Sequence, residues 1–207
     1  MRKEIMIALR ATFVTLILTG ILYPLATTGA AELLFGERAN GSLARGENGQ
    51  VVGSELIGQT FASPVYLQGR PSAAGNNGYD PTASSGSNFG TTSKKLQDRA
   101  AADVARLHKD NPGAPLPIPD DLVTASASGL DPEISPAGAL WQTARIAHAR
   151  NVAEDRIRAV VESHIEGRDL GFLGEPRVNV LAVNLALDQQ FGRPPSLPAS
   201  TTVAGTR

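Results

Sequence analysis

The feature that most constrains this chain is a run of 21 residues without a charged side chain, from Ala11 to Ala31. Arg10 precedes the run and Glu32 follows it. An α-helix of that length is about 30 Å long, the thickness of the hydrocarbon core of a bilayer. We therefore predict a single transmembrane helix over residues 11–31, with residues 1–10 as a short N-terminus before it.

A cleaved secretory signal peptide is the alternative for this run. Arg2 and Lys3 make a basic start, and small residues at 29–31 resemble a cleavage site. The apolar run continues to Ala26, however, beyond the roughly 7 to 15 residues of a typical signal-peptide core. This length favours an uncleaved anchor.

Within the predicted span, Leu16 and Leu18 belong to the apolar first half, and Pro24 lies in the second half. A charge at Leu18 is expected to weaken membrane insertion by a few kcal/mol. Proline removes one backbone donor, so we expect a kink there and a bond from Thr27 or Thr28 to a freed carbonyl.

Basic residues set the expected orientation. Arg2, Lys3 and Arg10 precede the span, whereas Arg38 and Arg45 are the basic residues close after it. This bias predicts a cytoplasmic N-terminus and an extracytoplasmic C-terminal part. The absence of cysteine agrees with an oxidising compartment without requiring one.

Beyond the anchor, the sequence predicts one α+β domain over residues 36–191 and a disordered, Pro/Ser/Thr-rich tail over residues 192–207. The formal net charge of the whole chain is −1, which offers no basic surface for nucleic acid. With no cysteine, a thiol nucleophile is excluded.

Hydrophobic periodicity and turn residues predict the elements of this domain. They are a hairpin over 42–52 with its turn at 45–49, a helix from Thr92 or Ser93 to about Lys109, a short helical turn after Asp120, a helix from Ser135 to about Arg150, a helix over 153–166 ended by Gly167, a strand over 177–183 and a helix over 184–191. In the helix from Ser135, the apolar face is predicted to hold Leu140, Trp141, Ala144, Ala147 and His148.

Residues 63–93 are rich in Gly, Ser and Asn and have almost no aliphatic side chain after Leu67. A flexible linker is one interpretation. An ordered binding loop, with turns fixed by its own Asn, Asp and Ser side chains, is the other. Tyr66, Arg70, Tyr79 and Phe89 favour the second, because simple linkers lack large anchoring side chains.

Catalytic and metal-binding signatures are weak. His108, His148 and His164 lie on separate predicted helices and are expected to be surface or packing residues rather than ligands. Asp131 and Glu133 are expected to cap the helix after Ser135 rather than bind a cation. The sequence has no Gly-x4-Gly-Lys-Ser/Thr loop, and the glycines at 86 and 90 resemble an ordinary turn. These features indicate an accessory protein.

Several sequence blocks together resemble the C subunits of the bacterial Kdp potassium-transporting P-type ATPase. The blocks are residues 23–25, 39–43, 53–59, 69–73, 86–88, 122–131, 149–151 and 180–188. They run in the family's order from about Arg10 to Gln189, which makes the resemblance specific. It also disfavours a cleaved signal peptide, because the family retains this helix.

The resemblance implies a non-catalytic, single-span accessory subunit in the bacterial inner membrane, with potassium as the ion transported by the complex. Its implied partners are a potassium-translocating subunit, an ATP-hydrolysing subunit and a very small membrane peptide. The family is described as a catalytic chaperone that raises the pump's affinity for ATP. The orientation predicted from Arg2, Lys3 and Arg10 places the domain on the side opposite ATP. The domain therefore acts indirectly, or the predicted orientation is wrong and it contacts ATP.

The family supplies no agreed catalytic residue for these blocks, so the expected sites are contact sites. We expect contact with the potassium-translocating subunit in the two Ser/Gly/Asn blocks, through Arg70, Ser72, Asn76, Ser87, Asn88, Ser126, Ser128 and Asp131. The alternative is that these residues fix turns inside the domain. For the whole chain, the alternative function is a stand-alone, membrane-anchored binding or hydrolase domain.

Overall fold

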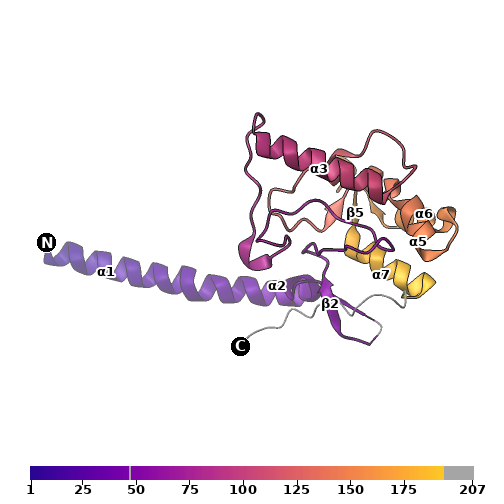
Figure 1. Cartoon of the computed structure of the whole chain (residues 1–207). Coiled ribbons are helices and arrows are strands. Elements are labelled where there is room, and N and C mark those ends of the chain that lie inside the picture. The colour runs from indigo at the N-terminus through magenta and orange to yellow at the C-terminus, as the bar shows by residue number, and fades with distance from the viewer. Residues whose placement is uncertain (47, 194–207) are drawn as a thin grey trace. The chain divides into compact units, whose positions relative to one another are not determined.

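The computed structural model describes residues 1–46 and 48–193, and it divides into two units, Met1–Leu43 and Ala44–Arg207. Each unit is described by itself (Figure 1). Glu47 of the predicted hairpin turn lies outside the described residues, as does the predicted tail from residue 194 onward.

One helical segment, Arg2–Ala39, makes up nearly all of the first unit. It consists of α1 (Arg2–Ile17), a π-helical turn η1 (Leu18–Leu22) and α2 (Tyr23–Ala39). Its 38 residues are long and apolar enough to cross a membrane, which makes it a candidate span by length and composition. The helix extends beyond the charge-free run at both ends.

The helix accommodates Pro24 through the π turn that precedes it. The Tyr23 N–H donates to the Leu18 carbonyl, five residues back, and Leu22 and Tyr23 keep helical dihedral angles. Thr27 Oγ1 donates to the Tyr23 and Pro24 carbonyls at 2.9 and 3.1 Å. The carbonyl that the missing Pro24 donor frees lies four or five residues before Pro24, so these bonds are not the predicted bond to a freed carbonyl. The non-helical residue is instead Phe35, with φ −139° and ψ 41°, which the sequence did not predict.

The second unit contains a three-stranded antiparallel sheet in the order β3 (Glu133–Ile134), β5 (Arg177–Asn179), β4 (Ile165–Glu166). Val178 of the central strand pairs with Ile134 on one side and with Ile165 on the other. Val178 is fully buried. This apolar row therefore places the sheet in the core, and the α+β prediction is confirmed.

Helices α4 (Pro136–Trp141), α5 (Thr143–Arg150), α6 (Glu154–Ser163) and α7 (Val180–Phe191) form what we call the helical layer. Helix α6 packs against α4, α5 and α7, while α4 and α7 also contact β5 (Figure 1). Most of the side chains that they bury completely are apolar: Ala139, Ile146, Ile157, Val161, Val183 and Leu187. The two polar exceptions are Gln142, between α4 and α5, and Thr143, the first residue of α5.

The single helix predicted from Ser135 to Arg150 is two helices. Its start is as predicted, because Ser135 Oγ accepts from the Gly138 N–H at 2.9 Å with Pro136 in the first turn. It breaks at Gln142, where φ −92° and ψ −6° tighten the turn. The predicted apolar face was wrong for Ala144 and His148, which are exposed.

Two further boundaries differ from the prediction for local reasons. Helix α6 ends at Ser163 rather than running to Gly167, because His164 leaves the helical region and residues 165–166 join the sheet as β4. The predicted strand over 177–183 ends at Asn179, whose Oδ1 accepts from the Ala182 N–H at 3.0 Å and caps α7. An apolar run such as 180–183 fits a strand or a buried helix equally well.

The hairpin, the helix that begins after Ser93 and the helical turn after Asp120 were predicted, whereas the 3-10 turn at Pro81–Ala83 was not. The hairpin consists of β1 (Leu43–Arg45) and β2 (Val51–Ser54), closed by the Gly46 N–H donating to the Gln50 carbonyl. Helix α3 (Lys94–Asp110) begins after Ser93, although no side-chain bond caps it, and Leu107 is its buried residue. Short 3-10 turns occupy η2 (Pro81–Ala83) and η3 (Asp120–Leu122).

Candidate partner-contact site

The two Ser/Gly/Asn blocks lie against each other in the structure. We call residues 69–88 and 124–131 the loop pair. The Ser85 N–H and the Ser84 hydroxyl both donate to the Ser128 carbonyl, at 2.9 and 3.0 Å. A Cβ on Gly129 would lie 2.6 Å from the Ser85 carbonyl oxygen, so glycine permits this approach. The ordered-loop interpretation of residues 63–93 therefore agrees with the structure better than the linker does.

Ser72 is the central side chain of the loop pair. Its hydroxyl donates to the Gly129 carbonyl at 2.6 Å and accepts from the Tyr79 N–H at 2.7 Å and the Ala74 N–H at 3.2 Å. One hydroxyl thus fixes the turn inside residues 72–79 and ties that turn to the second loop.

Arg70 and Asp131 form an ion pair across the two loops at 3.0 Å, with each side chain 27% exposed. Arg70 also reaches Thr124, and Asp131 accepts from the Glu133 N–H at 3.1 Å. The Tyr79 hydroxyl donates to the Arg70 carbonyl at 2.6 Å. Burial raises the pKa of Tyr79 to about 12, and the Asp131 charge adds to the shift while Arg70 opposes it.

The eight expected contact residues divide into two groups. Arg70, Ser72, Ser128 and Asp131 bond within the loop pair, and Ser126 is buried. Ser87 is half-buried, whereas Asn76 and Asn88 are exposed. Asn88 has φ +50°, a left-handed conformation that asparagine tolerates better than most residues.

A depression of about 410 Å³, lined mostly by charged residues, borders the loop pair. It is lined by Arg70, Asp121, Asp131, Glu133, Ile134, Ser135, Glu175, Pro176 and Arg177. Arg177 pairs with Glu133 and Glu166 at 3.0 Å and with Asp169 at 3.4 Å. The negative charges of these carboxylates raise the pKa of Arg177, and Glu133 has the largest effect. Burial raises the pKa of Glu133 itself.

Sequence reasoning missed Asp121, Glu175 and Arg177. The expected capping by Asp131 and Glu133 was wrong, because Asp121 instead accepts from the Ser135 N–H and hydroxyl, at 2.6 and 3.1 Å. Only the strand register brings Arg177 opposite Glu166, and no local pattern encodes that register. In the part of the chain that the structure describes, three or more His, Cys, Asp or Glu side chains nowhere gather as metal ligands do.

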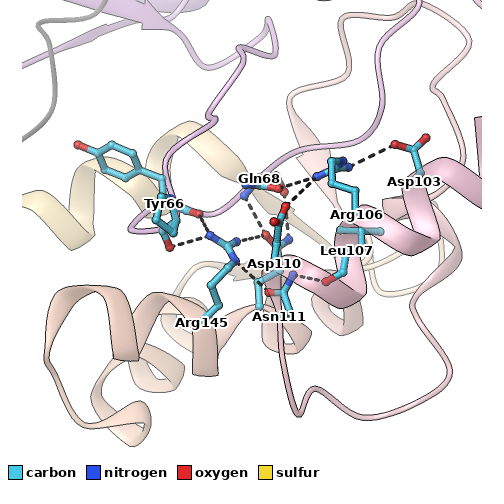
Figure 2. Close-up of polar contacts among 10 residues, drawn as sticks. Tyr66, Gln68, Asp103, Arg106, Leu107, Asp110, Asn111 and Arg145 are labelled. Atoms are coloured by element: carbon cyan, nitrogen blue, oxygen red, sulfur yellow. Dashed lines mark hydrogen bonds and ion pairs between the residues drawn. The ribbon is translucent and has the colours of Figure 1, made fainter.

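A buried arginine positions the start of the loop pair (Figure 2). Arg145 of α5 donates to the Pro64 and Tyr66 carbonyls, to Asn111 Oδ1 and to Gln142 Oε1, at 2.7 to 3.1 Å. Gln142 in turn bonds both the N–H and the carbonyl of Gln68. The helical layer therefore holds the backbone two residues before Arg70.

Arg145 and its neighbours also join α3 to this network (Figure 2). Asn111 follows α3 and donates to the Leu107 carbonyl, while Arg106 bonds Gln68, Asp103 and Asp110. Burial lowers the pKa of Arg145 to about 10, with the charge of Asp110 opposing the shift.

The comparisons with known proteins identify the family of this chain. The family model for KdpC, described as "K+-transporting ATPase, c chain", matches residues 5–189. The chain belongs to the KdpC family. The match includes residues 5–39 of the helical segment and both loops of the loop pair, so the family covers the predicted span and the candidate site together.

Relatives named "Potassium-transporting ATPase KdpC subunit" are similar over most of their length. The protein from Myxococcus xanthus is 60% identical over 185 residues, covering 89% of this chain and 87% of the relative. The protein from Koribacter versatilis is 48% identical over 188 residues, covering 91% and 95%. That from Caulobacter vibrioides is 53% identical over 175 residues, covering 84% and 87%.

Proposed function

We propose that this chain is an accessory subunit of an ATP-driven potassium-uptake complex. The observation that carries the proposal is the KdpC family match, which spans residues 5–189. Its partners are a potassium-translocating subunit, an ATP-hydrolysing P-type subunit and a small membrane peptide, and potassium is the ion transported. A chain that purifies in mild detergent as a monodisperse, ester-hydrolysing monomer would contradict this function and support the stand-alone alternative.

The proposed topology is a single pass through the bacterial inner membrane over residues 11–31. Arg2, Lys3 and Arg10 keep residues 1–10 in the cytoplasm, and residues 36–191 form the periplasmic domain. Leu16, Leu18 and Pro24 lie in the span, and Pro24 with the π turn before it is the candidate contact feature for partner helices. External protease should cleave the domain in intact spheroplasts; protection of the domain there would place it in the cytoplasm and favour direct ATP contact.

The proposed mechanism is indirect. The domain supports assembly and stabilises one conformational state of the pump, and through that state it raises the affinity for ATP or the turnover of the ATP-hydrolysing subunit. A tenfold change in affinity requires a coupling free energy of about 1.4 kcal/mol, which a few interface contacts supply.

The loop pair is the proposed contact with the potassium-translocating subunit. Arg70, Ser72, Ser128 and Asp131 shape it, and the exposed Asn76 and Asn88 are placed to touch the partner. The experiment is the ATP KM of the complex carrying Asn76→Ala with Asn88→Gly, because glycine keeps the left-handed backbone of residue 88. The KM should rise several-fold, while Gln97→Ala on the exposed face of α3 should leave it unchanged. An unchanged KM and unchanged assembly in the double variant would remove these residues from the interface.

A further inference from the structure

The connection between β4 and β5 carries three exposed apolar side chains within four residues. Leu170 is 84% exposed, Phe172 69% and Leu173 49%. Exposed apolar residues scattered singly are ordinary on protein surfaces, but a contiguous group of them marks an interaction site. We call residues 170–173 the knob.

The knob is held by its own backbone. Asp169 and Leu173 exchange two backbone hydrogen bonds of 2.9 Å, and the Gly171 N–H donates to the Arg168 carbonyl at 3.1 Å. At the base, Arg168 pairs with Glu175 at 2.7 Å. A closed turn of this size leaves its apolar side chains pointing outward, so their exposure follows from the backbone fold.

Leu170 occupies a backbone conformation that does not suit leucine. Its φ is +53°, and φ of the following Gly171 is +83°. Two successive positive φ values are typical of tight hairpin turns, which favour Asn or Gly at the first position. Leucine is sterically disfavoured in this conformation. Because its side chain is exposed, it gains little stabilising packing within the domain. A contact outside the domain would offset that cost.

Charges around the knob favour a protein over a lipid surface. Two guanidinium groups lie beside the knob: Arg168 pairs with Glu175, and Arg177 pairs with Glu133, Glu166 and Asp169. The same ion pairs therefore contain four carboxylates. Carboxylates thus exceed guanidinium groups by two. Anionic lipid head groups attract basic surfaces and repel this one. An apolar socket with a basic rim complements it.

We propose that the knob docks into an apolar, basic-rimmed socket on another subunit of the potassium-transporting complex. The inference rests on the proposed function, because it takes the partner from that complex. A rigid knob loses little conformational entropy on docking, and buried aromatic and aliphatic anchors supply most of the affinity of such contacts.

The direct test is photo-crosslinking in the assembled complex, with p-benzoylphenylalanine in place of Phe172. We expect a crosslink to one of the pump's other subunits. The matched control places the same probe at Leu116, an apolar residue that is 72% exposed elsewhere in the domain, and should give no such crosslink. Crosslinks to lipid alone, to a second copy of this chain or to nothing would overturn the proposal.

The second test is affinity. The full-length chain in detergent is titrated onto the complex formed by the remaining pump subunits. Leu170→Asn with Phe172→Ser should weaken binding at least tenfold, and Leu116→Asn should leave it within twofold of wild type. Asn suits the φ of residue 170, so thermal unfolding of the variant should not fall. Glu175→Gln should make binding less sensitive to sodium chloride.

The two proposals fail differently. If the wild-type chain does not bind the pump subunits, the proposed function fails and the docking proposal fails with it. If the wild-type chain binds and the double variant binds equally well, the knob is not an interface and the accessory function stands.

Discussion

The loop pair and the helical layer are held together by different forces. Between Gln68 and Ser93, Ala74 is the only buried residue, and turns there are fixed by hydrogen bonds such as those of Ser72. In the helical layer, Ile146, Ile157 and Leu187 are fully buried. Apolar packing spreads its stabilisation over many weak contacts, whereas a polar region depends on a few atoms.

This difference explains how a region with so little apolar surface keeps one conformation. A loop of this composition cannot offset its conformational entropy by burial. Hydrogen bonds hold the region at two places instead. Gln142 and Arg145 of the helical layer bind the backbone at 64–68, and the second loop pairs with the first through Ser128. The loop pair therefore depends on the helical layer.

The largest expected effect comes from the residue that joins the two regions. Arg145→Met removes the donor for four acceptors, on Pro64, Tyr66, Asn111 and Gln142. Buried acceptors left unpaired should lower the free energy of unfolding by about 3–5 kcal/mol. Urea unfolding followed by the fluorescence of Trp141, the only tryptophan, measures it.

The matched control for Arg145 is Arg106→Met. Arg106 also bonds Gln68, but its side chain is 46% exposed and its ion pairs are on the surface of α3. Its replacement should cost less than about 1 kcal/mol. Equal losses for the two variants would show that the helical layer does not hold the loop pair through Arg145.

Much of the architecture was predictable because it is encoded locally. The charge-free run, the Ser135-Pro136 helix start and the apolar stripe of α6 each sit within one element. The start of α7 was not predictable in this way, because residues 180–183 are apolar on every face and only the cap at Asn179 decides between strand and helix. The side chain of Gln142, where the helix breaks, bonds a partner 74 residues away, a contact that no local pattern encodes.

The candidate site was predictable in composition but not in geometry. The unusual Ser/Gly/Asn content at 69–88 and 126–131 identified the two loops, yet no local pattern shows that they bond to each other. The roles of Arg177 and Asp121 could not be predicted, because neither residue belongs to a recognisable sequence motif. Their positions follow from strand register and from the Ser135 cap.

A second prediction tests close backbone approach in the loop pair. Gly129→Ala places a Cβ 2.6 Å from the Ser85 carbonyl oxygen and 2.7 Å from the Ala74 nitrogen, at φ +69°. Backbone atoms cannot yield as a flexible side chain does, so we expect a loss of about 2–3 kcal/mol in the free energy of unfolding. Gly90→Ala, where no atom lies within 4 Å of the added Cβ, should cost nothing measurable.

A third prediction isolates the hydroxyl at the centre of the loop pair. Ser72→Ala leaves the Tyr79 N–H and the Gly129 carbonyl without their partner and should cost about 1–2 kcal/mol. Ser87→Ala is the control, because no hydrogen bond of that side chain is found among residues 1–46 and 48–193. If the two alanine variants unfold at the same urea concentration, the hydroxyl network does not hold the loops.

The smallest effect compares a tyrosine of the loop pair, Tyr79, with one that bonds the helical layer, Tyr66. The pKa of Tyr79 in the loop pair and that of Tyr66, which donates to Asp188 of α7, are both raised to about 12 from the ordinary 10.0, mainly by burial. Between these values the folded chain keeps a proton that the unfolded chain loses. Stability is therefore independent of these groups below pH 10 and falls as the pH rises toward 12.

Phenylalanine variants separate this contribution from the alkaline behaviour of the rest of the chain. Below pH 10, Tyr79→Phe should be less stable than wild type by about 1 kcal/mol, because the bond to the Arg70 carbonyl is lost. As the pH rises from about 10 toward about 12 this difference should shrink, since the variant has no phenol to titrate. Tyr66→Phe should behave likewise, and Phe61→Leu should show a constant difference. A constant difference for Tyr79→Phe as well would mean that solvent reaches its hydroxyl and that the loop pair is open there.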